Sequence, residues 1–515
     1  MLLFVFFAML WSVVLTFDIK DKRYGSTPPF ASAGLFLQEV MLRVEYAIEG
    51  AALKSSQFAS AAFSVFQGDE QMRSSARAIP ILTYHRIVWN SDEKNVSVRN
   101  FRDQMYALKH AGWETITLEE YKDFMAGKLT LPERSLLITF DDGAKESFYP
   151  VDPLFRALHF EGVIFIIASA MYTPESVYYL APEEIQRLLK SNRWEIGSHS
   201  FDGHRPYVAD SEGREAIFFA DKLWLPEEQR LESEKEFEAR VRSDLRKARE
   251  TLEREFGVEV DAFAFPLGNE TGIEGAANFP EGASITERAA SELYDLGFLQ
   301  TSNRDYSFNY PEESKFLAWR VHVHHDWDGA RLVQELEGGL PKQLPFSDNF
   351  AEDHGWIPAW GTLDRGRNNL SLKAFPDASS ASAFLDGSNL WDDYSFDVSM
   401  DWQSSHVFLL ADVANSKTYD ACVYSPGVVR LQSVHNGKVT TLAEMEDERI
   451  AYGSDARAGV RVRGAVIECL WNYESIVEAY SRERKGGVGV QVWDSELGKA
   501  SLRVSEALVR PFMNN

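Results

Sequence analysis

The hydrophobic and polar positions of the chain follow two patterns, which meet near residue 345. Between residues 79 and 345, short apolar runs alternate with longer segments in which apolar residues recur every three or four positions. Short apolar runs are typical of buried strands, and the longer spacing is typical of amphipathic helices. The predicted strands are 80–85, 134–140, 163–169, 194–200, 262–266, 298–302 and 318–323, and the predicted helices are 99–112, 151–162, 182–192 and 285–297. Strands that alternate with helices predict a parallel sheet or a barrel.

A charged insertion at 227–257 interrupts this alternation, and we predict a long exposed helix there. Beyond residue 345 the helical pattern ends. In 394–402 (YSFDVSMDW) apolar and polar residues alternate strictly, which is typical of a strand with one buried face. Segment 428–442 contains Asn436-Gly437, a dipeptide typical of a two-residue hairpin turn. These features predict a β-sandwich over 346–515.

The N-terminus carries a separate signal. Segment 2–17 (LLFVFFAMLWSVVLTF) is apolar and uncharged, and it is followed by DIKDKR. A bilayer-spanning helix needs ~20 residues, so this run suits a signal peptide or an uncleaved anchor, with a buried core helix as the alternative. We therefore assign 1–23 to a signal peptide or membrane anchor and 24–78 to a Ser/Ala-rich helical spacer, and we predict export.

Composition and charge narrow the class of partner. A chain of 515 residues is too long for one core and predicts two or three domains. The formal net charge of -25 argues against nucleic-acid binding, which requires a basic surface. The only cysteines are Cys422 and Cys469, which could form one disulfide in an oxidising compartment or remain two buried thiols.

The most informative stretch is 139–143 (TFDDG), where an apolar strand ends in two neighbouring carboxylates. Neighbouring side chains of a strand point to opposite faces, so Asp141 and Asp142 cannot both be ordinary surface residues of one sheet. A solvated Asp-Gly turn is the simple alternative. In parallel barrels, however, chemistry is located at the carboxyl ends of the strands, where both residues fall.

Two further strand ends carry imidazoles, in TYH at 83–85 and GSHSFDGH at 197–204. Asp142, His199 and His204 offer one carboxylate and two imidazoles, a ligand set suited to a divalent metal ion with open positions for water. Asp141 is then left beside the ion, where a carboxylate can take a proton from an activated water. This division of labour explains why the strand ends in two acids.

Together these motifs resemble those of the polysaccharide deacetylases, the NodB-like family 4 carbohydrate esterases, over residues 80–330. The resemblance implies an α/β fold, a deformed (β/α) barrel of the NodB type at 79–345. It implies that Asp141 is the catalytic base and that Asp142, His199 and His204 hold the metal. One extra residue separates the two histidines, as in the branch that acts on poly-β-1,6-N-acetylglucosamine.

The same resemblance assigns further roles. Segment 84–87 (YHRI) is similar to a strand of that branch whose histidine serves as the acid, which implies this role for His85. Segment 263–268 (FAFPLG) resembles the third motif and implies substrate contacts by Phe265 and Pro266. The arginine that tunes the base is missing just before this motif, and Arg320 is the candidate replacement. His322 and His324 are rival acids, with an exposed histidine cluster as the alternative.

The resulting prediction is an exported N-deacetylase whose partner is an N-acetylated polysaccharide similar to poly-N-acetylglucosamine. Its cofactor is a divalent ion, zinc first, with nickel, cobalt or iron(II) as alternatives. Other readings are a deacetylase of chitin-like or peptidoglycan substrates, an inactive glycan-binding or export factor, and a glycoside hydrolase. The sandwich resembles concanavalin-like and laminin-G-like domains, which often bind glycans. Its residues Trp391, Trp402 and Trp471 are predicted to be core rather than sugar platforms.

Overall fold

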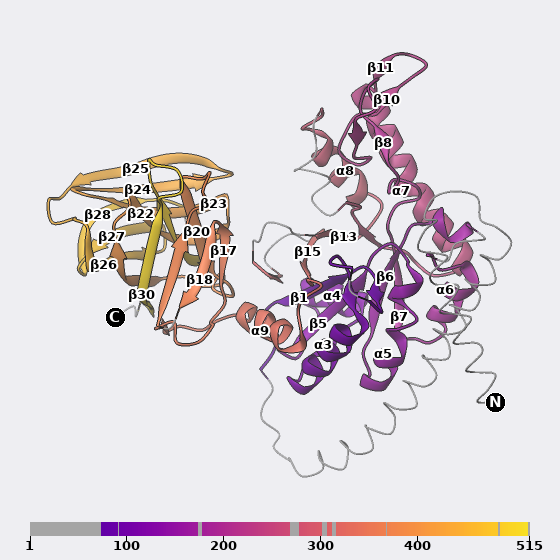
Figure 1. Ribbon diagram of the computed structural model, residues 1–515, viewed down its shortest axis with the longest axis horizontal. Coiled ribbons are helices and arrows are strands. Elements are labelled where there is room, and N and C mark those ends of the chain that lie inside the picture. The colour runs from indigo at the N-terminus through magenta and orange to yellow at the C-terminus, as the bar shows by residue number, and fades with distance from the viewer. Residues whose placement is uncertain are drawn as a thin grey trace, which may run out of the picture. The chain divides into compact units, whose positions relative to one another are not determined.

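A computed structural model describes residues 74–90, 92–173, 178–267, 278–300, 306–311, 316–366, 368–482 and 485–512 (Figure 1). Two compact units are present. One contains the described residues up to Gln300 together with Tyr310–Leu332, and the other contains Thr301–Asn309 and Val333–Asn515. The predicted N-terminal signal or anchor and nearly all of the predicted spacer lie outside the described residues. In the part of the chain that is described, no helix has the length and apolar character needed to cross a bilayer.

The first unit is built on a closed ring of seven parallel strands. Around the ring the strands are β1 (Ile79–Tyr84), β15 (Leu317–His322), β13 (Leu296–Gln300), β12 (Ala262–Ala264), β7 (Trp194–Ser198), β6 (Gly162–Ile166) and β5 (Ser135–Phe140). The ring closes because β1 pairs in parallel with both β5 and β15. The predicted α/β barrel is therefore confirmed, and all seven of its strands fall within the segments predicted from the sequence or within two residues of them.

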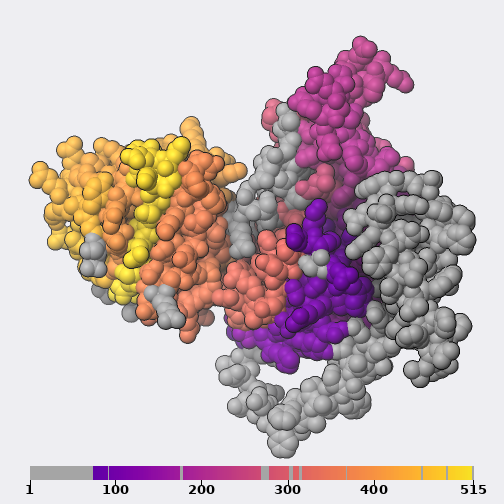
Figure 2. Space-filling model, viewed as in Figure 1, coloured from indigo at the N-terminus to yellow at the C-terminus, as the bar shows by residue number. Residues whose placement is uncertain are grey.

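Helices and short strands complete this unit. They are α3 (Val98–His110), α4 (Leu118–Met125), α5 (Asp152–Leu158), α6 (Pro182–Leu189), α7 (Glu234–Phe256) and α8 (Gly282–Ser291), with β2 (Ile87–Val88), β3 (Val96–Ser97), β4 (Glu114–Thr115), β8 (Tyr207–Val208), β9 (Glu215–Ala216), β10 (Trp224–Leu225) and β11 (Arg230–Leu231). The short strand β14 (Phe308–Asn309) is counted with the second unit. The β10–β11 hairpin projects from the body of the unit at the top of the view (Figures 1 and 2). Sequence periodicity does not predict α4, although its start carries a capping box in which Thr117 and Glu120 bond each other's backbone amides.

The prediction that the charged insertion forms a long exposed helix is wrong in one respect. Segment 234–256 is helical, as expected, but one face of α7 is buried. The buried positions recur every three or four residues: Phe237, Val241, Asp244, Leu245, Ala248, Thr251 and Leu252. The high content of charged residues conceals this stripe, because apolar spacing rather than overall polarity decides whether a helix packs. The buried stripe includes one carboxylate, that of Asp244.

The second unit is an antiparallel sandwich preceded by α9 (Gly329–Gly339). One sheet contains β18 (Thr362–Gly366), β19 (Asn369–Lys373), β30 (Ser501–Pro511), β21 (Tyr394–Trp402), β26 (Gly453–Arg463), β27 (Val466–Trp471) and β28 (Glu474–Tyr480), with β16 (Phe346–Asp348) paired to β30. The other contains β17 (Trp356–Trp360), β20 (Ser380–Leu385), β29 (Gly487–Trp493), β22 (His406–Asn415), β23 (Thr418–Ser425), β24 (Val428–His435) and β25 (Lys438–Glu446). The predicted sandwich is confirmed.

The alternation at 394–402 places its five apolar residues in the sandwich core, where each is at most 1% exposed. His435 pairs with Lys438 across Asn436-Gly437, and both turn residues have positive φ, as the hairpin prediction requires. Trp391, Trp402 and Trp471 belong to the same core cluster, so the prediction that they are structural is confirmed.

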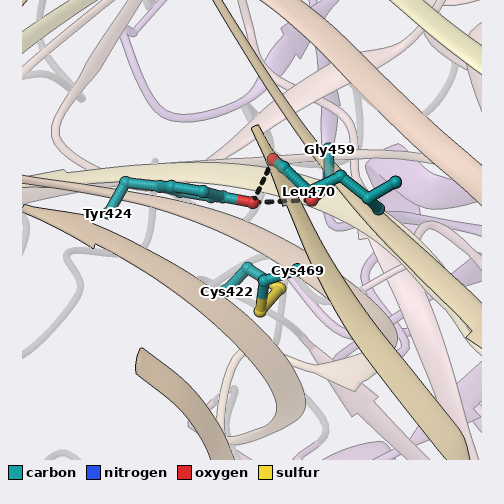
Figure 3. The surroundings of a disulfide bond; sticks show 5 residues. All are labelled: Cys422, Tyr424, Gly459, Cys469 and Leu470. Carbon is teal, nitrogen blue, oxygen red and sulfur yellow. Dashed lines mark hydrogen bonds between the residues drawn. A yellow bond between two sulfur atoms is a disulfide. The ribbon is translucent and has the colours of Figure 1, made fainter. Parts of the chain in front are cut away.

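A disulfide links the two sheets. Cys422 on β23 bonds to Cys469 on β27, and both are fully buried (Figure 3). Beside this bond, the Tyr424 hydroxyl on one sheet donates to the Gly459 and Leu470 carbonyls of the other, at 2.6 and 2.9 Å (Figure 3). The two sheets are therefore joined by a covalent bond and by hydrogen bonds at one point of the core.

We expect this bond to contribute substantially to the stability of the sandwich. The cysteines are 47 residues apart, and closing a loop of that size in the unfolded chain is worth about 4 kcal/mol at most. Replacing both with alanine should lower the unfolding free energy of the sandwich by roughly 2–4 kcal/mol in denaturant titrations. Reductant should destabilise the wild-type chain similarly and leave the double variant unchanged. An equal response of both chains to reductant would contradict this account.

Candidate active site at the mouth of the barrel

The inward-facing positions of the barrel strands lead to the predicted site residues. Side chains alternate along a strand, so every second residue points into the barrel. On β1, the positions from Ile79 to His85 begin in the apolar core cluster and end at the carboxyl end of the strand. On β5, the positions from Leu137 lead in the same way to Asp141, and on β15 those from Ala318 lead to His322. Three strands thus deliver polar groups to one end of the barrel.

The chain turns sharply between the two neighbouring carboxylates. Asp142 and Gly143 both have left-handed backbones, with φ of 72° and 70°. Glycine suits position 143 because of this left-handed backbone, and a Cβ there would also lie 2.9 Å from Ile166 Cδ1, so the isoleucine side chain would have to move. This turn frees Asp142 from the strand's alternation, so its carboxylate faces His199 and His204 while Asp141 remains at an inward-facing position of the barrel. The backbone turn therefore explains how two neighbouring carboxylates at the end of β5 can have different surroundings.

The two histidines come from the end of β7 and the loop after it. The His199 backbone N–H donates to the Ile166 carbonyl at 2.8 Å, which continues the sheet by one residue. The loop that leads to His204 is fastened by α7. The Asp244 carboxylate accepts from the backbone N–H groups of Phe201 and Asp202, both at 2.9 Å. Burial raises the pKa of Asp244 against the opposing effect of these hydrogen bonds.

Asp142, His199 and His204 form a group that could hold a metal ion. One ligand atom from each lies within 4.8 Å of the others. His204 Nε2 is 3.3 Å from Asp142 Oδ1, and His199 Nε2 is 3.6 Å from the same oxygen. Among the described residues this oxygen is buried and has no hydrogen-bond partner. A buried carboxylate oxygen without a partner is costly unless a cation is bound beside it.

The protonation state of His199 also fits a metal site. Its Nδ1 lies 2.9 Å from the Ala264 carbonyl oxygen. A carbonyl only accepts, so we assign the proton to Nδ1 and the lone pair to Nε2, which faces Asp142. Burial lowers the pKa of His199 to about 4, so the ring is neutral near pH 7. A neutral imidazole with its second nitrogen fixed by a carbonyl is the usual form of a metal-binding histidine.

Asp141 is held by a buried guanidinium. Arg320 donates from Nη1 to Oδ1 at 2.7 Å and from Nη2 to Oδ2 at 2.8 Å, and both side chains are at most 2% exposed. Burial alone would raise the pKa of Asp141, but the charge and hydrogen bonds of Arg320, together with the neighbouring imidazoles, hold the pKa well below its usual range. The carboxylate is therefore ionised and fixed in orientation. That Arg320 replaces the arginine missing before 263–268 stays a prediction.

Three histidines are candidates for the acid, and the structure separates them. His85 follows Tyr84, whose strand partner is Phe140, so it lies at the strand end next to Asp141. The His322 ring is 6.0 Å from the His85 ring, and its Nδ1 is 2.5 Å from the Gln300 amide nitrogen. Burial, followed by the neighbouring charges, lowers the pKa of His322 to about 4, which makes it a poor proton donor near pH 7.

His324 differs from the other two. It is exposed, and its ring stacks on Trp327 at a centroid distance of 5.3 Å. The predicted histidine cluster thus divides into a half-buried member that faces His85 and an exposed member on the following loop. Of the two half-buried histidines, His322 has the lowered pKa, whereas His85 lies at the strand end next to Asp141.

The predicted substrate-contacting residues are both buried. Phe265 is 1% exposed and packs edge-on against Phe263 at a centroid distance of 4.9 Å. Pro266 is also buried, whereas the next residue, Leu267, is 51% exposed and has a left-handed backbone with φ of 65°. Both predicted side chains are therefore buried, and their contact with a substrate stays a prediction.

Sequence reasoning missed three residues around the site: Asp244, Gln300 and Tyr178. The Tyr178 hydroxyl donates to Asp142 Oδ2 at 3.4 Å. Asp244 could have been found, because it lies within the apolar stripe of α7, where an unpaired carboxylate would be unfavourable. Gln300 and Tyr178 carry no such signal, since each acts through a contact that only the folded chain creates.

We expect Asp244 to position the His204 loop. Asp244→Ala should weaken binding of a divalent ion by roughly 10–100-fold, because it removes the acceptor of two loop amides, as is typical of groups that orient metal ligands. Titration calorimetry with zinc would measure the change. Glu250→Ala, at an exposed position of the same helix, is the matched control. Equal zinc affinity in the two variants would show that the loop does not depend on Asp244.

Comparison with known proteins defines the class to which this barrel belongs. The family model for polysaccharide deacetylase matches residues 128–274, a stretch that contains Asp141, Asp142, His199 and His204. The chain therefore carries a polysaccharide deacetylase domain.

The individual relatives are distant in sequence. The poly-beta-1,6-N-acetyl-D-glucosamine N-deacetylase of Escherichia coli strain K12 is 24% identical over 197 residues, which cover 36% of this chain and 29% of that protein. The chain thus matches less than a third of the length of this relative. Among solved structures, the BpsB deacetylase domain from Bordetella bronchiseptica is 22% identical, with a TM-score of 0.41, over 48% of this chain and 96% of that one. IcaB from Ammonifex degensii is 24% identical, with a TM-score of 0.38, over 49% and 94%.

Proposed function

We propose that this protein is a metal-dependent N-deacetylase that removes acetyl groups from an N-acetylated polysaccharide. One observation carries the proposal: an Asp–His–His group with an unpaired buried oxygen lies beside a carboxylate that is fixed by a buried arginine. Both are located within the segment that matches the deacetylase family. The named activity of the Escherichia coli relative supports a poly-N-acetylglucosamine-like substrate.

Asp142, His199 and His204 would hold the ion, with zinc as the first candidate and nickel, cobalt or iron(II) as alternatives. A divalent ion bound there would supply Lewis acidity, which polarises an acetyl carbonyl and lowers the pKa of water. Asp141 accepts the proton of the attacking water, and Arg320 keeps it ionised and oriented. His85 gives a proton to the departing amine. The products are acetate and an amino sugar with a new positive charge.

Export follows from a separate observation. The Cys422–Cys469 disulfide spans the sandwich core, and disulfides of this structural kind form in oxidising compartments. We therefore propose that the protein acts outside the cytoplasm, in agreement with the apolar segment 2–17.

Product analysis tests the reaction type. Mass spectrometry of N-acetylglucosamine oligomers after incubation should show loss of acetyl groups with unchanged chain length. Shorter oligomers would instead indicate a glycoside hydrolase. That alternative requires a protonated carboxylic acid, and the pKa of Asp141 is shifted in the opposite direction. A panel that includes β-1,6-linked, β-1,4-linked and peptidoglycan-derived substrates separates the substrate classes.

The identity of the acid can be tested by comparing two histidines. His85→Ala should keep the metal content but lose most turnover on acetamide substrates, because the amine can no longer be protonated as it leaves. His324→Ala is the matched control at the same end of the barrel and should have a much milder effect. The reverse ranking, with metal content unchanged, would assign the acid to the loop after β15.

A further inference from the structure

The outer face of the seven-stranded sheet in the sandwich carries an unusual row of side chains. Directly paired residues of neighbouring antiparallel strands point to the same face of a sheet. The observed register therefore aligns one row across six strands: Trp360, Ser382, Gln491, Phe408, Val423 and Arg430. The residues that alternate with this row, such as Ala381 and Val490, belong to the sandwich core. The row thus lies on the face directed away from the core.

Two polar side chains in the middle of this row are buried without partners. Ser382 and Gln491 are paired across β20 and β29 and are 0% and 8% exposed. In the described structure neither Ser382 Oγ nor Gln491 Oε1 has a hydrogen-bond partner. Buried polar atoms are normally hydrogen-bonded, and leaving two of them unpaired side by side is unfavourable. This part of the face therefore has unused hydrogen-bonding capacity at two adjacent positions.

Aromatic rings flank these two atoms. Trp360 is paired with Ser382, and its indole N–H donates to Ser380 Oγ at 3.0 Å, which fixes the ring over the outer face. Trp493, two residues after Gln491, stacks on His406 with ring centroids 5.0 Å apart and an interplanar angle of 21°. Both tryptophans are partly exposed. Flat apolar surfaces beside unpaired hydroxyl and amide groups suit a ligand whose own surface alternates between C–H faces and hydroxyl groups.

We propose that this face binds a saccharide segment of a neutral glycan, at a site separate from the barrel mouth. The rings of Trp360 and Trp493 would pack on pyranose faces, while Ser382 and Gln491 bond to hydroxyl or acetamido groups. Charge agrees with a neutral ligand, because Arg430, the only charged residue in the row above, is paired with Glu444 at 2.6 Å. The Cys422–Cys469 disulfide is attached to the opposite face of the same sheet, which makes it a rigid support.

The test uses the full-length chain with Asp141→Asn, so that no substrate is consumed. Titration calorimetry would measure binding of two probes, a β-linked N-acetylglucosamine oligomer and a cello-oligosaccharide without acetamido groups. Trp493→Ala should weaken binding of at least one probe about tenfold or more. Gln491→Leu should weaken it as well while leaving thermal stability equal or higher, because it removes an unpaired polar atom. Tyr480→Ala, at an 80% exposed aromatic residue on the other sheet, is the matched control and should bind normally.

The outcomes keep this inference apart from the proposed function. In the chain with Asp141 intact, Trp493→Ala should release acetate from short soluble substrates at the normal rate, because the residue is not part of the barrel site. Equal affinity of the Trp493→Ala, Gln491→Leu and Tyr480→Ala chains for both probes would overturn the saccharide site, as would no binding of either probe by the control chain. Neither result would affect the interpretation of acetate release. Should Trp493→Ala fail to fold, Gln491→Leu alone decides the question.

Discussion

His199→Ala should abolish bound metal and catalysis together. His199 is 2% exposed, its Nδ1 is fixed by the Ala264 carbonyl, and its Nε2 faces the unpaired oxygen of Asp142. Alanine would remove one of three ligands and leave only Asp142 and His204 at the site. We expect zinc content to fall below detection and acetate release to fall by on the order of 1,000-fold, as expected when one of three protein ligands of a catalytic ion is lost. Metal analysis of the dialysed protein and an acetate assay measure the two effects.

The control for this variant is His324→Ala, which removes an imidazole from the exposed loop after β15. It should retain both the metal and most of the activity. Full activity in a metal-free His199→Ala preparation would contradict the assignment of the metal site.

Replacing the two neighbouring carboxylates one at a time should affect metal binding and turnover differently. Asp142→Asn should weaken metal binding, because a neutral amide is a poorer ligand for a divalent cation. Asp141→Asn should keep the ion and lower turnover by about 100-fold or more, because it removes the base. The separation is expected because Asp141 contacts Arg320 through both oxygens, whereas Asp142 faces the histidines.

Metal content and turnover would be measured in parallel on both variants, with thermal unfolding to confirm that each is folded. Asp141→Asn leaves Arg320 buried without its full counter-charge, so some loss of stability is expected in this variant. Equal loss of metal in the two variants would show that the roles of the carboxylates are assigned wrongly.

The sequence predicts the fold well where one periodicity dominates. Strand and helix spacing predicts the barrel, and strict alternation predicts β21 and its buried residues Tyr394 to Trp402. The prediction fails where charged residues hide a buried face or where an element is short. The charges of α7 conceal its buried face, and α4 has only eight residues, too few for a periodic pattern to stand out.

The candidate site, too, can be predicted from the sequence only in part. Motif spacing predicts which residues gather at the barrel mouth, because strand ends fix their places. It cannot predict that Asp244 fastens the His204 loop or that Ser382 and Gln491 meet on one face of a sheet. Those relations depend on the packing of a helix against a loop and on strand register, which arise only when distant segments fold together.

The most direct test of the central claim is acetate release from a poly-N-acetylglucosamine oligomer by one protein preparation in three states: as purified, after chelation, and after zinc is restored. The account predicts acetate release in the first state, a loss to the level of the Asp141→Asn variant in the second, and recovery in the third. Acetate release that continues unchanged in the chelated, metal-free protein would contradict it.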